Sequence, residues 1–123
     1  MSSPSYILTP TARKHLREAK AWSKSRWGEA LTAQYFHDLD QAARYLAEHH
    51  TQTSKRSDLA GDSGLGIYSV REHYLIYEPI APQTIVIVAV LRQVRDVTAI
   101  LSRYSYLIKR ELDELRRTDN SET

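Results

Sequence analysis

The sequence predicts an α+β fold: a short N-terminal strand and a helical hairpin pack on a small antiparallel β-sheet, followed by a long C-terminal helix. Two amphipathic stripes meet at Gly28, and three segments rich in β-branched and aromatic residues follow between residues 65 and 91. The chain has 123 residues and no cysteine, which is the length of one domain without a disulfide framework. We therefore expect a single domain over residues 1–117 and a frayed tail over residues 118–123.

The first half of the chain has the pattern of a strand followed by two helices. Residues 6–8 are aromatic or branched and apolar, which favours a short strand. Pro10 suits the first turn of a helix, and a threonine on either side of it can supply the N-cap. An apolar stripe at helical spacing follows, formed by Ala12, Leu16, Ala19 and Trp22. Gly28 is suited to end this helix, and a second helix is expected over residues 29–48.

The second half has the pattern of a loop, three strands and a helix. Residues 49–64 show no period, which predicts a long loop. Strands are expected over residues 65–70, 73–78 and 84–91. The first two strands are separated by two residues and should pair antiparallel, and two prolines predict a turn before the third. A final helix over residues 98–117 carries one apolar stripe, formed by Leu101, Tyr104, Leu107, Ile108, Leu112 and Leu115.

The third predicted strand is unusual because residues 85–91 are apolar at every position. An antiparallel strand with one face in water normally alternates between apolar and polar residues. This strand therefore needs cover on both of its faces. The helical hairpin can cover one face, and the other must be covered by the C-terminal helix or by a second chain.

Composition excludes several classes of protein. The longest apolar run has seven residues, far fewer than the roughly 20 of a membrane helix, so we expect no membrane contact. The absence of cysteine fits the reducing cytoplasm, where we expect the protein to act. No metal-binding, phosphate-loop or serine-hydrolase motif is present, so neither a metal nor a cofactor is expected. The net charge is only +2, but residues 9–27 carry six basic residues against one acidic residue. Such a face either attracts polyanions or is simply solvated.

A set of short motifs occurs in a fixed order along the chain. They are Tyr6-Ile-Leu-Thr-Pro-Thr-Ala12, Trp27-Gly-Glu-Ala30, His73-Tyr-Leu-Ile-Tyr77, Ile85-Val-Ile-Val-Ala-Val-Leu91 and Arg95-Asp96. Over about residues 5–101 this ordered set resembles the RelE/ParE superfamily, the toxins of type II toxin–antitoxin systems, and its ParE-like branch in particular. Two positions depart from that pattern: Arg92 stands where relatives usually have histidine, and Gly66 where they usually have a basic residue.

The resemblance implies a choice between two activities. ParE-like members poison DNA gyrase by binding and are neutralised by a small antitoxin whose segment wraps the toxin. RelE-like members cleave mRNA on the ribosome. The resemblance to the ParE-like branch favours a binding protein over an enzyme, with nucleic acid contacted only indirectly through the antitoxin or gyrase. A third hypothesis, prompted by Gly66, is a decayed member that keeps only antitoxin binding.

Cleavage of RNA without a metal requires a general acid, a general base and a cation on the phosphate. The nuclease alternative would use His73 and Tyr74 as acid and base, with Arg71 on the phosphate. Arginine is always charged, so it can hold a phosphate but transfers protons poorly. No histidine follows Arg92 in the chain.

Two groups of candidate contact residues follow from the preferred hypothesis. Target contacts are expected at Arg71, Arg92, Arg95 and Asp96, with the alternative that Arg95 and Asp96 merely begin the last helix. Antitoxin contacts are expected on the apolar stripe of the last helix, at Leu101, Tyr104, Ile108 and Leu112. The antitoxin segment should be disordered when free and order on contact. The same stripe could instead join two copies of the chain.

Overall fold

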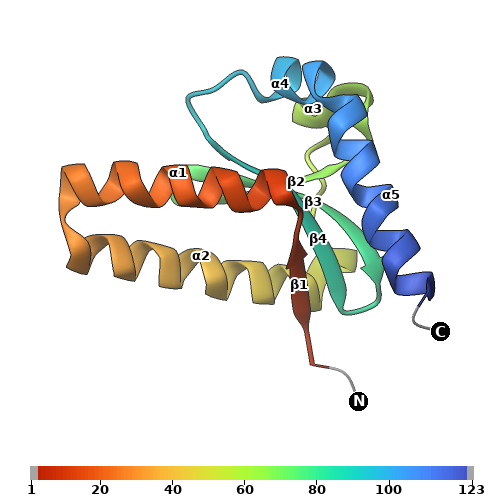
Figure 1. Ribbon diagram of the computed structural model, residues 1–123, viewed down its shortest axis with the longest axis horizontal. Helices are drawn as coiled ribbons and strands as arrows, with labels where there is room; N and C mark the ends of the chain where they lie inside the picture. Colours follow the sequence, from red (N-terminus) through yellow and green to blue (C-terminus); the bar gives the residue numbers. More distant parts are fainter. Residues whose placement is uncertain (1–2, 122–123) are drawn as a thin grey trace.

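The computed structural model describes the backbone of residues 3–121 and the side chains of residues 3–117. The main elements are β1 (Ser5–Leu8), α1 (Pro10–Trp27), α2 (Glu29–His49), α3 (Ser57–Ala60), β2 (Gly66–Val70), β3 (His73–Ala81), β4 (Thr84–Arg92), α4 (Val97–Arg103) and α5 (Ser105–Ser121). Figure 1 shows the α1–α2 hairpin on one side of the strands and α5 on the other. The predicted α+β fold, with its hairpin and C-terminal helical segment, is confirmed.

The sheet has the strand order β1-β4-β3-β2 and is mixed. β2, β3 and β4 form the predicted antiparallel ribbon, whereas β1 pairs parallel with β4, with Leu8 opposite Ile87. The first strand is therefore an edge strand of the sheet. β4 is consequently a central strand over its first half only.

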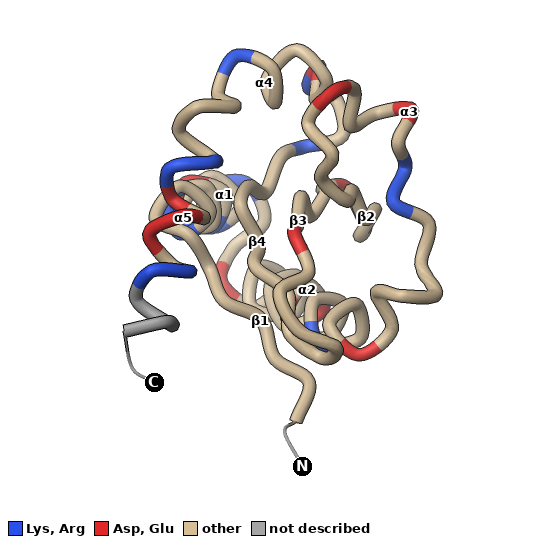
Figure 2. The backbone as a smooth tube through the Cα atoms, turned by 90° about the vertical axis from the view of Figure 1, so that its right-hand side faces the viewer, with Lys and Arg blue, Asp and Glu red and all other residues tan. Residues whose placement is uncertain are grey.

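β4 is covered on both faces, as its apolar run requires. Ile85 and Ile87 pack in the core beneath the α1–α2 hairpin, while Val86 and Val88 pack in the opposite core with α4 and α5; all four are 0–2% exposed. The C-terminal helical segment, and not a second chain, supplies the second cover. Figure 2 shows the contrast in charge: β4 carries none along most of its length, whereas α5 carries both acidic and basic residues.

Thr9 joins the first helix to the sheet. Its Oγ1 accepts the Ala12 N–H at 3.1 Å and so caps α1, while its own N–H donates to the Ile87 carbonyl at 3.1 Å. Pro10 follows at the first helical position, as the sequence predicts. Gly28 has φ +86° and separates α1 from α2, a conformation that glycine adopts without strain.

The C-terminal helix is broken, which corrects the prediction of one helix over residues 98–117. α4 ends at Arg103 and α5 begins at Ser105, with Tyr104 between them. The break lets α4 pack beside α3 while α5 crosses the sheet (Figure 1). α5 extends to Ser121, beyond the expected end at Arg117, and residues 122–123 of the expected frayed tail lie outside the described residues.

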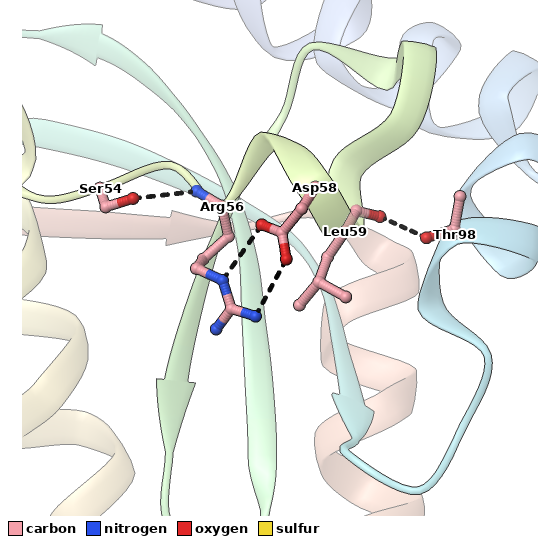
Figure 3. Close-up of polar contacts among 5 residues, drawn as sticks. All are labelled: Ser54, Arg56, Asp58, Leu59 and Thr98. Atoms are coloured by element: carbon pink, nitrogen blue, oxygen red, sulfur yellow. Dashed lines mark hydrogen bonds and ion pairs between the residues drawn. The ribbon is translucent and has the colours of Figure 1, made fainter.

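Polar contacts hold this C-terminal segment in place. The first turn of α1 contains no acidic residue, and Glu111 of α5 supplies a carboxylate at this helix end instead. This carboxylate accepts hydrogen bonds from the Thr11 N–H at 3.3 Å and from the Thr11 hydroxyl at 3.0 Å. Arg116 pairs with Glu78 of β3 at 3.2 Å. At the other end, the Thr98 hydroxyl of α4 donates to the Leu59 carbonyl of α3 at 2.7 Å (Figure 3).

Two further predictions about the connections need correction. β3 continues through Pro79 to Ala81, where a turn was expected. β2 pairs with β3 only as far as Tyr77, so at Pro79 the strand has β4 as its one neighbour, and a register shift follows between Pro79 and Ala81. The expected loop over residues 49–64 contains short helical turns, α3 among them. In that segment Arg56 has φ +53° and is paired with Asp58 at 3.2 Å (Figure 3).

Replacement of Leu112 by alanine should measure how much α5 contributes to the core. Leu112 is 5% exposed, so Leu112→Ala should lower the free energy of unfolding by about 2–4 kcal/mol through lost burial and a residual cavity. Urea unfolding followed by circular dichroism measures this value. Leu31, which is 63% exposed on α2, is the control, and Leu31→Ala should change the free energy by less than about 0.5 kcal/mol. Equal effects of the two substitutions would contradict the assignment of α5 to the core.

Candidate functional site

A groove of about 480 Å³ lies between α1, the second half of β4 and the α4–α5 segment. Its floor is apolar and consists of Ala89, Val90 and Leu91. The α1 wall is formed by Lys14, His15 and Trp22, among others, and the opposite wall by Ile100, Leu101, Tyr104 and Leu107. Arg92, Arg95 and His73 also line it. We call this concavity the α1/α4 groove.

The structure brings two of the four expected target contacts to the α1/α4 groove. Arg92 and Arg95 both line it, and Arg92 lies over the Trp22 ring at 4.5 Å. Asp96 instead caps α4, since its carboxylate accepts the Ala99 N–H at 3.1 Å. Asp96 therefore begins the helix, as the alternative interpretation of this pair states. Arg95 precedes the helix and is exposed.

Arg71, the third arginine, lies away from the groove. It sits at φ +53° in the turn between β2 and β3, a turn for which the sequence lacks the usual glycine. Its guanidinium forms an ion pair with Asp38 of α2 and lies 4.8 Å from the centre of the Tyr35 ring. These two contacts hold the turn against the hairpin, so Arg71 has a structural role.

Positive charge at the groove is poorly compensated. Within residues 3–117, where side chains are described, neither Arg92 nor Arg95 forms an ion pair. Lys14 has only Glu18, at 3.9 Å between two exposed side chains, and such a pair contributes little. The groove therefore combines an apolar floor with a basic rim, which suits a ligand that is both apolar and acidic.

His73 is a buried neutral histidine. The Tyr35 hydroxyl accepts the Glu72 N–H at 3.1 Å and shares a second hydrogen bond with His73 Nδ1, at 2.6 Å. The direction of this second bond is set by the tautomer of the imidazole. Burial, and then the nearby charge of Arg92, lower the pKa of His73 below 6.5. Burial likewise raises the pKa of Tyr35, so this tyrosine stays protonated.

His15 is a groove residue that the sequence analysis did not identify. Its Nδ1 accepts the Val90 N–H at 3.1 Å, so the ring must be neutral, and burial lowers its pKa. The signal that could have identified this wall is the spacing of Thr11, His15, Glu18 and Trp22, which places them on one face of α1. That face was overlooked because the neighbouring apolar stripe dominates the helical pattern.

The residues of the nuclease alternative are not brought together. His73 projects toward the hairpin and contacts Tyr35, whereas Tyr74, the next residue of β3, packs in the core beneath α4 and α5. Successive side chains of a strand point to opposite faces, so the two cannot act on one phosphate. Arg71 is engaged with Asp38. These three residues form no common acid–base site.

The expected antitoxin contacts are divided between core and surface. Leu101, Ile108 and Leu112 are 1–5% exposed and pack on the sheet of their own chain. Tyr104, at the helix break, is 47% exposed and lines the α1/α4 groove. Most of this apolar stripe is therefore buried within the chain. Of the four expected antitoxin contacts, Tyr104 is the one that is exposed to a partner.

Gly66 has a packing explanation. A Cβ atom at this position would lie 2.3 Å from Cζ of Tyr77, whose ring is fully buried. A basic side chain at position 66, as in the pattern of relatives, would require Tyr77 to move. The departure at Gly66 is therefore coupled to the packing of Tyr77.

No group of three or more His, Cys, Asp or Glu side chains among the described residues is placed to bind a metal ion. No helix in the same part of the chain is long and apolar enough to cross a membrane.

Comparison with known proteins assigns the family. The family described as ParE toxin of type II toxin–antitoxin system, parDE, matches residues 6–97. No curated protein matches the chain significantly. One similar solved structure is described as the chromosomal ParDE toxin–antitoxin system from P. aeruginosa, with a TM-score of 0.61 and 14% identity over 73% of this chain and 96% of that chain. At this identity the similarity concerns the fold.

Because the family match spans most of its length, the chain belongs to the ParE toxin family of type II toxin–antitoxin systems, and membership implies an antitoxin partner. The match ends at residue 97. Most of the α4–α5 segment, which covers the second face of the sheet, follows the matched residues.

His73, which is buried, and His15, which is half-buried, should make stability depend on pH. Because the folded pKa values of His15 and His73 are lowered, the unfolded chain binds protons at a higher pH than the folded chain. The free energy of unfolding should therefore be constant above the unfolded pKa of 6.5 and decrease as the pH falls below it toward the lowered folded values. His73→Gln should reduce this decrease, as measured by urea unfolding at about pH 7.5 and pH 5. His37→Gln, at an exposed position on α2, is the control and should leave it unchanged.

Proposed function

We propose that this chain is a toxin that acts by binding, with DNA gyrase as its target, and that a cognate antitoxin neutralises it. Membership of the ParE family supports the toxin role. The single observation that carries the binding mode is the pair of arginines at the α1/α4 groove, Arg92 and Arg95, which lack carboxylate partners in the described part of the chain. Free guanidinium groups beside an apolar floor suit contact with another protein.

Contact with a target, and not turnover, agrees with the chemistry of the groove. Arginine can hold an anion but does not exchange its proton at physiological pH. The Nδ1 atoms of His15 and His73 are both engaged, with Val90 and Tyr35 respectively. A toxin of this kind would act in the cytoplasm, where gyrase and DNA are found.

The nuclease hypothesis remains the alternative activity, and the structure offers it one specific observation. His73 lies in the α1/α4 groove opposite Arg92 across the β3–β4 pair, so one imidazole and one cation are neighbours. The hypothesis of a decayed toxin differs from both, because it implies no effect on growth at all. Expression of the chain alone distinguishes the three hypotheses.

Expression of the chain without its partner should arrest bacterial growth and induce the DNA-damage response while transcripts stay intact. Purified protein should inhibit gyrase supercoiling. The double variant Arg92→Glu/Arg95→Glu should raise the concentration needed for half inhibition about tenfold or more, because it reverses both free charges at the contact. Arg103→Glu, an exposed position on α4 outside the groove, is the matched control and should inhibit like the wild type.

Other outcomes of the same experiment would reject the proposal. Transcript cleavage that is lost in His73→Gln or Tyr74→Phe, with the fold intact by circular dichroism, would establish the nuclease. Growth without arrest, in cells that accumulate folded protein, would establish the decayed toxin. Arrest and supercoiling inhibition that persist unchanged in the double variant would show that the groove arginines do not contact the target.

A further inference from the structure

We propose that the outer face of α1 is a binding site for the phosphate backbone of duplex DNA, separate from the α1/α4 groove. The choice of duplex DNA over duplex RNA rests on the proposed function, because gyrase acts on DNA. A site of this kind makes the contact with nucleic acid direct, whereas the sequence analysis expected only indirect contact. Three observations support it: the alignment of four cations, their lack of acidic partners and the absence of apolar anchors beside them.

Four basic residues form a single stripe along α1. Successive members are four, three and four positions apart, and these spacings return to the same side of a helix with about 3.6 residues per turn. All four side chains are exposed. We call this set the α1 stripe; its members are Arg13, Arg17, Lys20 and Lys24. At a rise of about 1.5 Å per residue they extend over about 16 Å. A duplex of that length carries on the order of ten phosphates, enough to face four cations.

The α1 stripe lies on the opposite side of the helix from the α1/α4 groove. His15 and Trp22, which line the groove, each follow a stripe residue, Arg13 or Lys20, by two positions. Two positions turn an α-helix by about 200°, so the two sets of side chains project in opposite directions. None of the four stripe residues lines the groove. Contact with a target at the groove therefore leaves the α1 stripe accessible.

Acidic side chains do not neutralise the α1 stripe. Within residues 3–117, none of its four cations forms an ion pair. Glu18, the acidic residue of α1, pairs instead with Lys14, which lies outside the stripe. On α2, by contrast, Arg44 pairs with Asp40 one helical turn away. Four uncompensated cations on one helix face repel one another, and a bound polyanion relieves this repulsion.

The surroundings of the α1 stripe favour phosphate over other acidic partners. None of the large apolar side chains exposed in the described part of the chain belongs to α1. A protein interface normally has an apolar centre, and a helix bound to a membrane surface inserts apolar side chains. Single-stranded nucleic acid is normally held by aromatic rings on which its bases stack. Because the outer face of α1 offers cations alone, it suits a duplex bound through its phosphates and without regard to sequence.

The test measures binding of the purified full-length chain to a DNA duplex of about 20 base pairs by fluorescence anisotropy, between about 50 and 200 mM salt. Four phosphate contacts should give a slope of about −3.6 when the logarithm of the association constant is plotted against the logarithm of the salt concentration. Affinity should therefore fall roughly a hundredfold across this range. At physiological salt, the dissociation constant should lie between about 1 and 100 μM, as is typical of binding without sequence preference.

Arg17→Gln/Lys20→Gln removes the two central cations of the α1 stripe and keeps good helix formers at both positions. The slope should change to about −1.8, and binding at about 50 mM salt should weaken about tenfold or more. Arg103→Gln/Lys109→Gln is the matched control, because it removes one exposed arginine and one exposed lysine from α4 and α5. This control should keep the slope and weaken binding by less than about twofold. Circular dichroism verifies that both variants fold.

Lysine acetylation of the wild-type chain locates the contact without any substitution. Lys20 and Lys24 should be acetylated more slowly when the DNA duplex is present, because bound phosphates cover their amino groups. Lys109, exposed on α5, should react at the same rate with and without DNA. Mass spectrometry of the acetylated peptides measures these rates.

The proposal would be overturned if the stripe variant and its control bound DNA equally well, if the duplex left Lys20 and Lys24 unprotected, or if the wild-type chain did not bind DNA. Tighter binding to mixed phosphatidylserine and phosphatidylcholine vesicles, or to duplex RNA of the same sequence, would overturn it as well, because the stripe would then have a different partner. No step of this test contains gyrase, so all these outcomes leave the proposed function intact. Loss of gyrase inhibition with DNA binding retained would instead count against the proposed function alone.

Discussion

The burial of β4 on both faces is the constraint on which the rest of this molecule depends. Ile85 and Ile87 face one core and Val86 and Val88 the other, and a strand of this kind is stable only when each face is covered. The α1–α2 hairpin covers the first face. The second is covered by α4 and α5, most of whose residues follow the family match. The C-terminal segment is therefore part of the hydrophobic core and not an appendage to it.

The α1/α4 groove is a consequence of the same arrangement. β1 is short and pairs with β4 only as far as Ile87, after which the chain leaves the sheet through Thr9 into α1. α1 and α4 then flank the remaining edge of β4, and His15 partners part of it. The strand edge, the apolar floor and the two arginines therefore lie in one concavity.

The departures from the family pattern have physical explanations in this chain. Arg92 stands where relatives usually have histidine, and its guanidinium stacks on Trp22 of α1. A stacked arginine keeps its charge at every physiological pH, which favours permanent electrostatic contact over proton transfer. Gly66 leaves the space that the Tyr77 ring occupies.

The sequence by itself determined the fold class, the hairpin around Gly28, the antiparallel ribbon and the need to cover β4 twice, because these follow from local periodicity and turn chemistry. Only the tertiary structure decided the parallel pairing of β1, the break at Tyr104 and the assembly of His15, Arg92 and Arg95 into one groove. Such features depend on which side chains meet across elements far apart in the chain. Periodicity within one segment identifies a face but not the element that packs against it.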